Sequence, residues 1–111
     1  MITMYTSGQG ISAHVDLPKF TDGIVGLSFG GSCVMEFRPI ARPVGSVGPA
    51  TSEIELQDGD LLVLLGPARY SYNHCIPGES VTETRISLTF RKLILEEGVC
   101  PQRFQNTPTT Y

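Results

Sequence analysis

The sequence has little that would support a disulfide scaffold, a structural zinc site or a membrane span. Its three cysteines, Cys33, Cys75 and Cys100, are odd in number and form no Cys-x-x-Cys pair. This spacing argues against a disulfide framework and a zinc site, and it fits a reducing intracellular compartment. The N-terminus has no basic segment leading into an apolar run, and no apolar stretch reaches the about 18 residues of a membrane span. We expect a soluble protein with no membrane partner, in the cytoplasm or nucleus.

An excess of positive charge is also absent. The formal net charge is -3, so there is no overall field to attract a nucleic-acid backbone, and binding of that kind would need a local patch. The 111 residues allow one domain, and with 41% hydrophobic and 17% charged residues the chain should fold. We expect this domain at residues 1–95, followed by a polar tail at residues 96–111.

Helical periodicity is missing as well. No stretch repeats apolar residues at the 3.6-residue spacing over two turns, and 12 glycines and 8 prolines separate short apolar or alternating runs. The Gly30-Gly31 pair between two such runs predicts a hairpin, and residues 38–52, rich in glycine and proline, predict the longest loop. The pattern favours an all-β barrel or jelly roll of about eight short strands. The predicted strands are 1–5, 11–16, 24–29, 32–37, 53–56, 61–65, 69–76 and 84–95.

The triplet His14-Val15-Asp16 is the strongest candidate for a metal site. In an extended backbone, residues i and i+2 point to the same face, so His14 and Asp16 can reach one common point. His74, the only other histidine, lies in another predicted strand. Two imidazoles and one carboxylate form the facial triad of non-heme Fe(II) oxygenases. A His-x-acid triplet also arises by chance, so the motif alone leaves a non-ligand role open.

The strand that contains Arg85 and Arg91 is the candidate site for an acidic ligand. Arg85, Ser87, Thr89 and Arg91 share one face of this strand, because alternate residues point the same way. Two arginines that lean inward could bracket a small dicarboxylate, since a guanidinium binds a carboxylate with two parallel hydrogen bonds. The alternative is an exposed edge strand with a polar outer face.

Other polar and aromatic residues are weaker candidates. Arg69 and Tyr72, together with Tyr70, could contact a flat substrate by stacking near the metal, although packing in the core is the alternative for the tyrosines. Cys75 follows His74 and should point to the opposite face, where packing is the expected role.

Taken together, these motifs resemble one family over roughly residues 3–93. The chain looks like the AlkB-like 2-oxoglutarate- and Fe(II)-dependent dioxygenases. The segments that carry the resemblance are Tyr5-x2-Gly8-Gln9-Gly10-Ile11-x2-His14-x-Asp16, Gly26-Leu27-Ser28-Phe29-Gly30, Asp58-Gly59-Asp60-Leu61, Ala68-Arg69-Tyr70-x3-His74 and Arg85-x-Ser87-Leu88-Thr89-Phe90-Arg91.

The resemblance implies a fold, a set of cofactors and an activity. The fold would be a double-stranded β-helix, and the cofactors would be Fe(II), 2-oxoglutarate and O2. By the same resemblance His14, Asp16 and His74 would hold the iron, while the 2-oxoglutarate ligands would be Arg85, Arg91, Tyr5 and Ser87. The activity would be hydroxylation or oxidative demethylation of a nucleic acid, such as tRNA, or of a protein.

The sequence departs from the family pattern in three places. Thr3 replaces the usual asparagine, and Leu17-Pro18 replaces the acidic residue that reads the base in repair-type members. We also expect that the N-terminal lid over the substrate is missing. The segments around Gln9-Gly10-Ile11 and Ala68-Arg69-Tyr70 look closer to branches that act on tRNA wobble uridines or on non-repair targets than to the DNA-repair branch. The alternatives are a catalytically weak or inactive AlkB-like module that binds metal or a partner, and a cupin-like metal enzyme that uses no oxo-acid.

Overall fold

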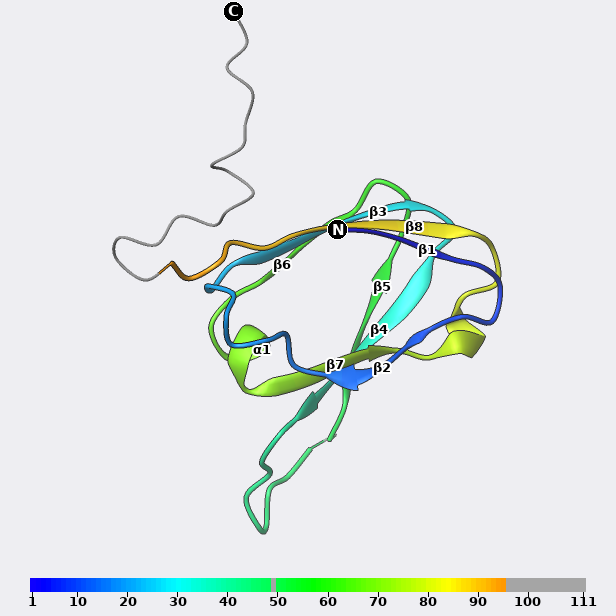
Figure 1. Cartoon of the computed structure of the whole chain (residues 1–111). Helices are drawn as coiled ribbons and strands as arrows, with labels where there is room; N and C mark the ends of the chain where they lie inside the picture. The colour runs from blue at the N-terminus through cyan, green and yellow to red at the C-terminus, as the bar shows by residue number, and fades with distance from the viewer. Residues whose placement is uncertain (49, 96–111) are drawn as a thin grey trace, which may run out of the picture.

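The computed structural model describes residues 1–48 and 50–95, which form two four-stranded antiparallel sheets that face each other (Figure 1). The first sheet has the order β1-β8-β3-β6 and the second β2-β7-β4-β5. This arrangement is a jelly roll, so the predicted all-β fold of eight short strands is confirmed. The predicted tail at 96–111 lies outside the described residues. The strands of the first sheet are β1 (Ile2–Tyr5), β8 (Arg85–Phe90), β3 (Ile24–Gly30) and β6 (Leu61–Leu64), and those of the second are β2 (Ile11–His14), β7 (Tyr72–Ile76), β4 (Cys33–Pro39) and β5 (Ser52–Leu56).

Two short helical turns interrupt the strands. The helix α1 (Pro67–Tyr70) begins with a proline, whose fixed φ angle suits the first turn, and it follows Gly66 at a positive φ of 53°. The second turn is the 3-10 helix η1 (Gly78–Ser80). The predicted strand 69–76 was therefore wrong at its start, because β7 begins only at Tyr72. Within the described ranges, no helix is long and apolar enough to cross a membrane.

The predicted hairpin around Gly30-Gly31 was wrong, because the two strands that flank it belong to different sheets. β3 pairs with β6 and β8, whereas β4 pairs with β5 and β7. The amide of Gly31 donates to the carbonyl of Thr84 at 2.8 Å, and the amide of Gly30 donates to the Asp58 carboxylate at 2.9 Å. These long-range hydrogen bonds fix the glycine pair where the chain passes from one sheet to the other.

Two predicted strands end at least two residues earlier than expected. β8 ends at Phe90 rather than at residue 95, and beyond it only an isolated bridge joins Leu93 to Phe20. β2 ends at His14 rather than at Asp16. The backbone after His14 leaves the sheet, and its carbonyl groups bind a side chain instead of a neighbouring strand.

β8 has its polar face inside the molecule and its apolar face outside. It lies between β1 and β3, so the alternative of an exposed edge strand was wrong. Arg85, Ser87 and Thr89 line an internal cavity. Ile86 and Phe90, on the opposite face, are 38% and 56% exposed. The hydrophobic core borders this cavity, because Met35, Leu56 and Ile76 line it. The core is made of Cys33, Met35, Leu56, Ile76 and Val81.

Gly10 is packed so closely that a larger residue cannot fit. A Cβ atom added there would overlap the carbonyl oxygen of Ile76 and would lie 2.7 Å from the amide nitrogen of Gly78. We expect Gly10→Ala to lower the free energy of unfolding by about 1–3 kcal/mol, the usual cost of overpacking. Urea denaturation can measure this. Gly26→Ala is the matched control, because a Cβ atom at Gly26 meets nothing within 4 Å. Equal stability of the two variants would contradict the packing seen here.

Candidate metal centre

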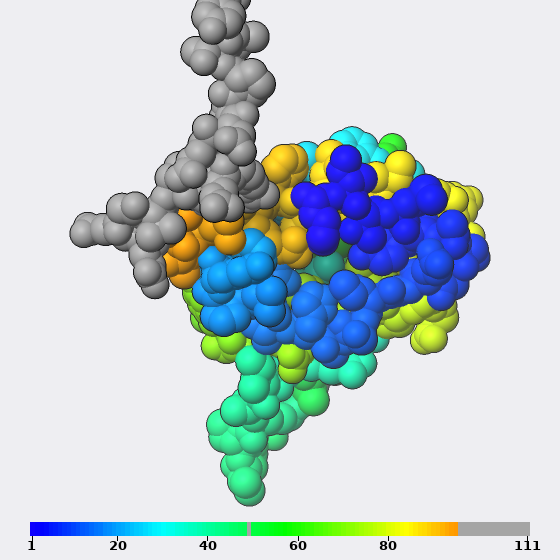
Figure 2. Space-filling view, viewed as in Figure 1, coloured from blue at the N-terminus to red at the C-terminus, as the bar shows by residue number. Residues whose placement is uncertain are grey.

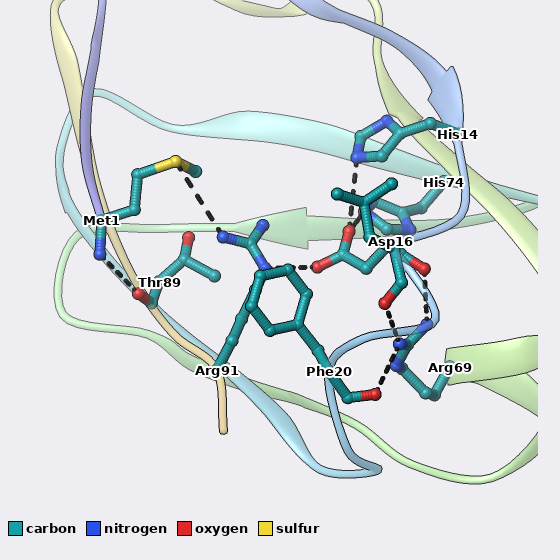
Figure 3. Close-up of polar contacts among 9 residues, drawn as sticks. Met1, His14, Asp16, Phe20, Arg69, His74, Thr89 and Arg91 are labelled. Carbon is teal, nitrogen blue, oxygen red and sulfur yellow. Dashed lines mark hydrogen bonds and ion pairs between the residues drawn. The ribbon is translucent and has the colours of Figure 1, made fainter. Parts of the chain in front are cut away.

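Three side chains that could bind a metal ion converge between the two sheets. His14 ends β2 and pairs in register with His74 of β7, which places the two imidazoles side by side. Asp16 lies two residues beyond β2 and turns its carboxylate toward both rings (Figure 3). One ligand atom from each of the three residues lies within 4.8 Å of the other two. The structure thus brings together the three residues that the sequence singled out.

The distances within this cluster suit a shared cation. The Nε2 atoms of His14 and His74 each lie 3.4 Å from Oδ1 of Asp16. Two ligand atoms bound at about 2.1 Å from one ion stand roughly 3–3.5 Å apart, so little movement is needed. Asp16 is 6% exposed, and its Oδ1 atom is buried with no hydrogen-bond donor among the residues that the structure describes. Because a buried carboxylate oxygen without a partner is costly, this atom calls for a cation.

The protonation of the two imidazoles also fits metal binding. Nδ1 of His14 lies 2.8 Å from the carbonyl oxygen of Ser12, which can only accept a hydrogen bond. In the neutral ring the proton therefore lies on Nδ1, and Nε2 presents a lone pair to the cluster. Burial, and then the nearby His14, lower the pKa of His74 below its ordinary value. His74 is thus held in the neutral form that binds metals.

The second carboxylate oxygen of Asp16 is held by Arg91. The Nε atom of Arg91 donates to Oδ2 of Asp16 at 2.6 Å, and the Arg91 guanidinium lies 5.4 Å from the centre of the Phe20 ring (Figure 3). This ion pair was not foreseen, because the sequence gives no sign that the end of β8 approaches the segment after β2. One oxygen of Asp16 is fixed by a cation from the protein, and the other remains free for a ligand.

The residues predicted to bind 2-oxoglutarate line one cavity together with the three candidate metal ligands. Its volume is about 80 Å³, several times the roughly 10–15 Å³ that one water molecule needs. The space-filling view shows a hollow between β1, in dark blue, and the segment that carries β2 (Figure 2). The predicted 2-oxoglutarate ligands in this lining are Tyr5, Arg85, Ser87 and Arg91.

Arg85 is a buried cation with no acidic partner among the described residues. It is 2% exposed, and its Nη2 atom donates a hydrogen bond to Oγ of Ser28 at 3.0 Å, the only one that its side chain makes in the described part of the chain. Its Nε atom has no acceptor, and its guanidinium lies 5.3 Å from the centre of the Tyr5 ring. An uncompensated buried charge is strongly unfavourable, so the arrangement calls for an anion in the cavity.

Ser28 is a residue that the sequence reasoning missed as part of the site. It is 2% exposed, and its Cα lies opposite that of Ser87 in the pairing of β3 with β8. Ser28 stands among apolar neighbours in a short run. A polar residue at such a position could have indicated a partner for a buried charge, but only once the pairing of the strands was known.

Arg69 and Tyr72, the residues predicted to contact a substrate, are not part of the cavity lining among the described residues. Arg69 is 2% exposed, and its guanidinium donates hydrogen bonds to the backbone carbonyls of Asp16, Leu17 and Phe20. This burial does not support a contact with substrate. Tyr72 is half-buried at the start of β7 and does not line the cavity in the described part of the chain, so its role stays a prediction.

Comparison with known proteins places the chain in a family. The family model of the 2OG-Fe(II) oxygenase superfamily matches residues 1–91. The chain is 31% identical over 114 residues to an alkylated DNA repair protein ALKBH8 homolog of Arabidopsis thaliana, covering 83% of this chain and 33% of that protein. It is 32% identical over 107 residues to the uncharacterized protein L905 of Acanthamoeba polyphaga mimivirus, covering 87% and 49%.

A third relative carries a methyltransferase name. The chain is 41% identical over 76 residues to the tRNA (carboxymethyluridine(34)-5-O)-methyltransferase alkbh8 of Xenopus tropicalis, covering 68% of this chain but 11% of that protein. The chain thus spans 33% and 49% of the first two relatives and a smaller part of the third. The matched residues 1–91 include every residue that lines the cavity described above. The chain therefore belongs to the AlkB-like 2OG-Fe(II) oxygenases, a family that uses Fe(II), 2-oxoglutarate and O2.

Proposed function

We propose that this chain is the catalytic jelly roll of an Fe(II)- and 2-oxoglutarate-dependent dioxygenase. The observation that carries the proposal is a pair of unsatisfied buried groups in one cavity. Oδ1 of Asp16 has no donor and calls for a cation, while the guanidinium of Arg85 has no acidic partner in the described chain and calls for an anion. A metal ion and a small oxo-acid, bound side by side, would satisfy both.

Each residue then has a defined task. His14, Asp16 and His74 would hold Fe(II), leaving its other side open to ligands. Arg85 would bind a carboxylate of 2-oxoglutarate, with Tyr5 and Ser87 beside it, and Arg91 would fix Asp16 while facing the same cavity. When bound, Fe(II) with O2 and 2-oxoglutarate supplies oxidative decarboxylation of the oxo-acid to succinate and CO2, coupled to hydroxylation of a C–H bond.

For the target, we propose a nucleic acid, with tRNA first, and a protein second. The support is the similarity to one relative named for alkylated DNA repair and to another named for tRNA carboxymethyluridine. If the hydroxylated carbon is an N-methyl group, the product would lose it as formaldehyde, and the net result would be demethylation.

The direct test is succinate formation in the presence of Fe(II) and 2-oxoglutarate. Wild-type protein is expected to form succinate, and His14→Ala is expected to reduce the rate at least 100-fold, because one of three ligands is lost. The test uses circular dichroism to check that the variant is folded. Equal turnover by the two proteins would remove His14 from the metal centre.

The second candidate is a module of the same family that binds metal or a partner and has little or no turnover. The observation that favours it is the ion pair between Arg91 and Asp16, because it occupies one of the arginines predicted to bind 2-oxoglutarate. Consumption of 2-oxoglutarate without any added substrate separates the two candidates. A catalytic protein is expected to show slow uncoupled consumption that needs Fe(II), whereas an inactive module shows none.

Replacing Ser28 should have a smaller effect on 2-oxoglutarate binding, and this effect should act through Arg85 alone. Ser28→Ala removes the only side-chain hydrogen bond that the Arg85 guanidinium makes within residues 1–48 and 50–95. We expect the KM for 2-oxoglutarate to rise about tenfold with little change in kcat, since a hydrogen bond to a charged group contributes roughly 1.5–3 kcal/mol. Steady-state kinetics measure both constants. Ser32→Ala, at an exposed serine, is the matched control. An unchanged KM in Ser28→Ala would argue against this role of the bond.

A further inference from the structure

Arg69 is a buried arginine to which the proposed reaction gives no role. It is 2% exposed and sits in α1, immediately before the strand that carries His74. Burying a guanidinium is costly unless its donors are satisfied. Arg69 satisfies two of its nitrogens through backbone carbonyls rather than a carboxylate.

All three carbonyls belong to the segment that follows β2. Nη1 of Arg69 donates to the carbonyl of Asp16 at 2.9 Å, and Nη2 donates to those of Leu17 and Phe20 at 2.9 and 3.0 Å (Figure 3). The segment has left the sheet at His14, so these carbonyls have no partners in a neighbouring strand. The rigid fork of the guanidinium therefore fixes the backbone where a strand no longer does.

Asp16 is consequently held from both ends by two arginines. Arg69 binds its backbone carbonyl, and Arg91 binds Oδ2 of its carboxylate, which leaves Oδ1 aimed at His14 and His74. Phe20 forms a second link, because its carbonyl binds Arg69 while its ring lies beside Arg91. A single guanidinium thus connects the α1–β7 region, which carries His74, to the segment that carries Asp16.

We propose that Arg69 is a positioning residue of the metal centre, which sets the place of the Asp16 carboxylate relative to His74. This inference rests on the proposed function of the cluster as a metal site. Residues that orient metal ligands typically change metal affinity 10–100-fold when they are replaced. A residue that only stabilised the fold would lower the unfolding temperature and leave the affinity of the folded protein unchanged.

The test is Co(II) binding by the complete chain, measured by isothermal titration well below the unfolding temperature. Arg69→Lys, which keeps the charge but lacks the fork, is expected to weaken Co(II) binding tenfold or more. Arg38→Lys is the matched control, because Arg38 is an exposed arginine whose side chain pairs with Glu36; it should bind Co(II) as the wild type does. Arg69→Gln, whose amide can donate two hydrogen bonds, replaces Arg69→Lys if that variant does not fold.

The outcomes separate this inference from the proposed function. Co(II) affinity within twofold of the wild type in a folded Arg69 variant would overturn the positioning role and leave the metal centre intact. If neither Arg69 variant folds, Arg69 serves the whole fold and the positioning role is wrong. If the wild type itself does not bind Co(II), or binds it as tightly with His14→Ala, the metal centre fails as well.

Discussion

Replacing Asp16 by asparagine is expected to abolish metal binding and turnover, with succinate formation reduced at least 1,000-fold. The substitution keeps the shape of the side chain but removes its charge. Oδ1 of Asp16 faces both histidines, and Oδ2 accepts a hydrogen bond from Arg91. The single change therefore removes the anionic ligand and also leaves the guanidinium of Arg91 without its acidic partner, a loss that is costly for a partly buried pair.

Co(II) titration and succinate formation measure the two losses separately. Asp58→Asn is the matched control, because Asp58 is an exposed aspartate in the turn between β5 and β6 and does not line the cavity. The control should keep both activities. If Asp16→Asn kept Co(II) affinity within threefold of the wild type, the carboxylate would not be a ligand, and the cluster would be a hydrogen-bonded group instead.

The alternation of polar and apolar residues was enough to predict most of the strands, but not how they pair. Residues 85–90 show a clear period of two, and the structure has a strand there with the expected two faces. Periodicity does not say which face is internal, and here the polar one is. The hairpin at Gly30-Gly31 was wrong for a related reason. A glycine pair permits a sharp change of direction, whereas distant partners such as Thr84 and Asp58 decide where the chain goes.

For the candidate site too, the sequence predicted some features and left others open. His14 and Asp16 are two residues apart, so the sequence could predict that they lie near each other, and His74 was included because it is the only other histidine. The roles of Arg69 and Arg91 depend on contacts across 53 and 75 residues of sequence. Spacing along one strand cannot reveal such contacts. The sequence thus identified residue types suited to the chemistry, while their hydrogen-bond partners needed the fold.

Arg85 allows a test in which ligand binding and stability are expected to change in opposite directions. Arg85→Met removes a buried cation that has no acidic partner in the described residues. Without 2-oxoglutarate, we expect the free energy of unfolding to rise by about 1 kcal/mol, because an apolar side chain of similar length replaces an uncompensated charge. The dissociation constant of 2-oxoglutarate should rise about 100-fold, because the carboxylate of the bound 2-oxoglutarate would no longer have a buried cation to pair with.

Urea denaturation and calorimetric titration of 2-oxoglutarate, both with the metal site filled by Co(II), measure the two effects. Arg85→Lys keeps the charge but not the fork, so its affinity should fall about tenfold, between the wild type and Arg85→Met. Arg38→Met controls for the loss of an exposed arginine. A purely structural Arg85 would give the reverse pattern, because its loss would lower stability and leave 2-oxoglutarate affinity unchanged. A rise in stability together with a fall in 2-oxoglutarate affinity therefore distinguishes an anion-binding arginine from one that only packs in the fold, whichever target the protein oxidises.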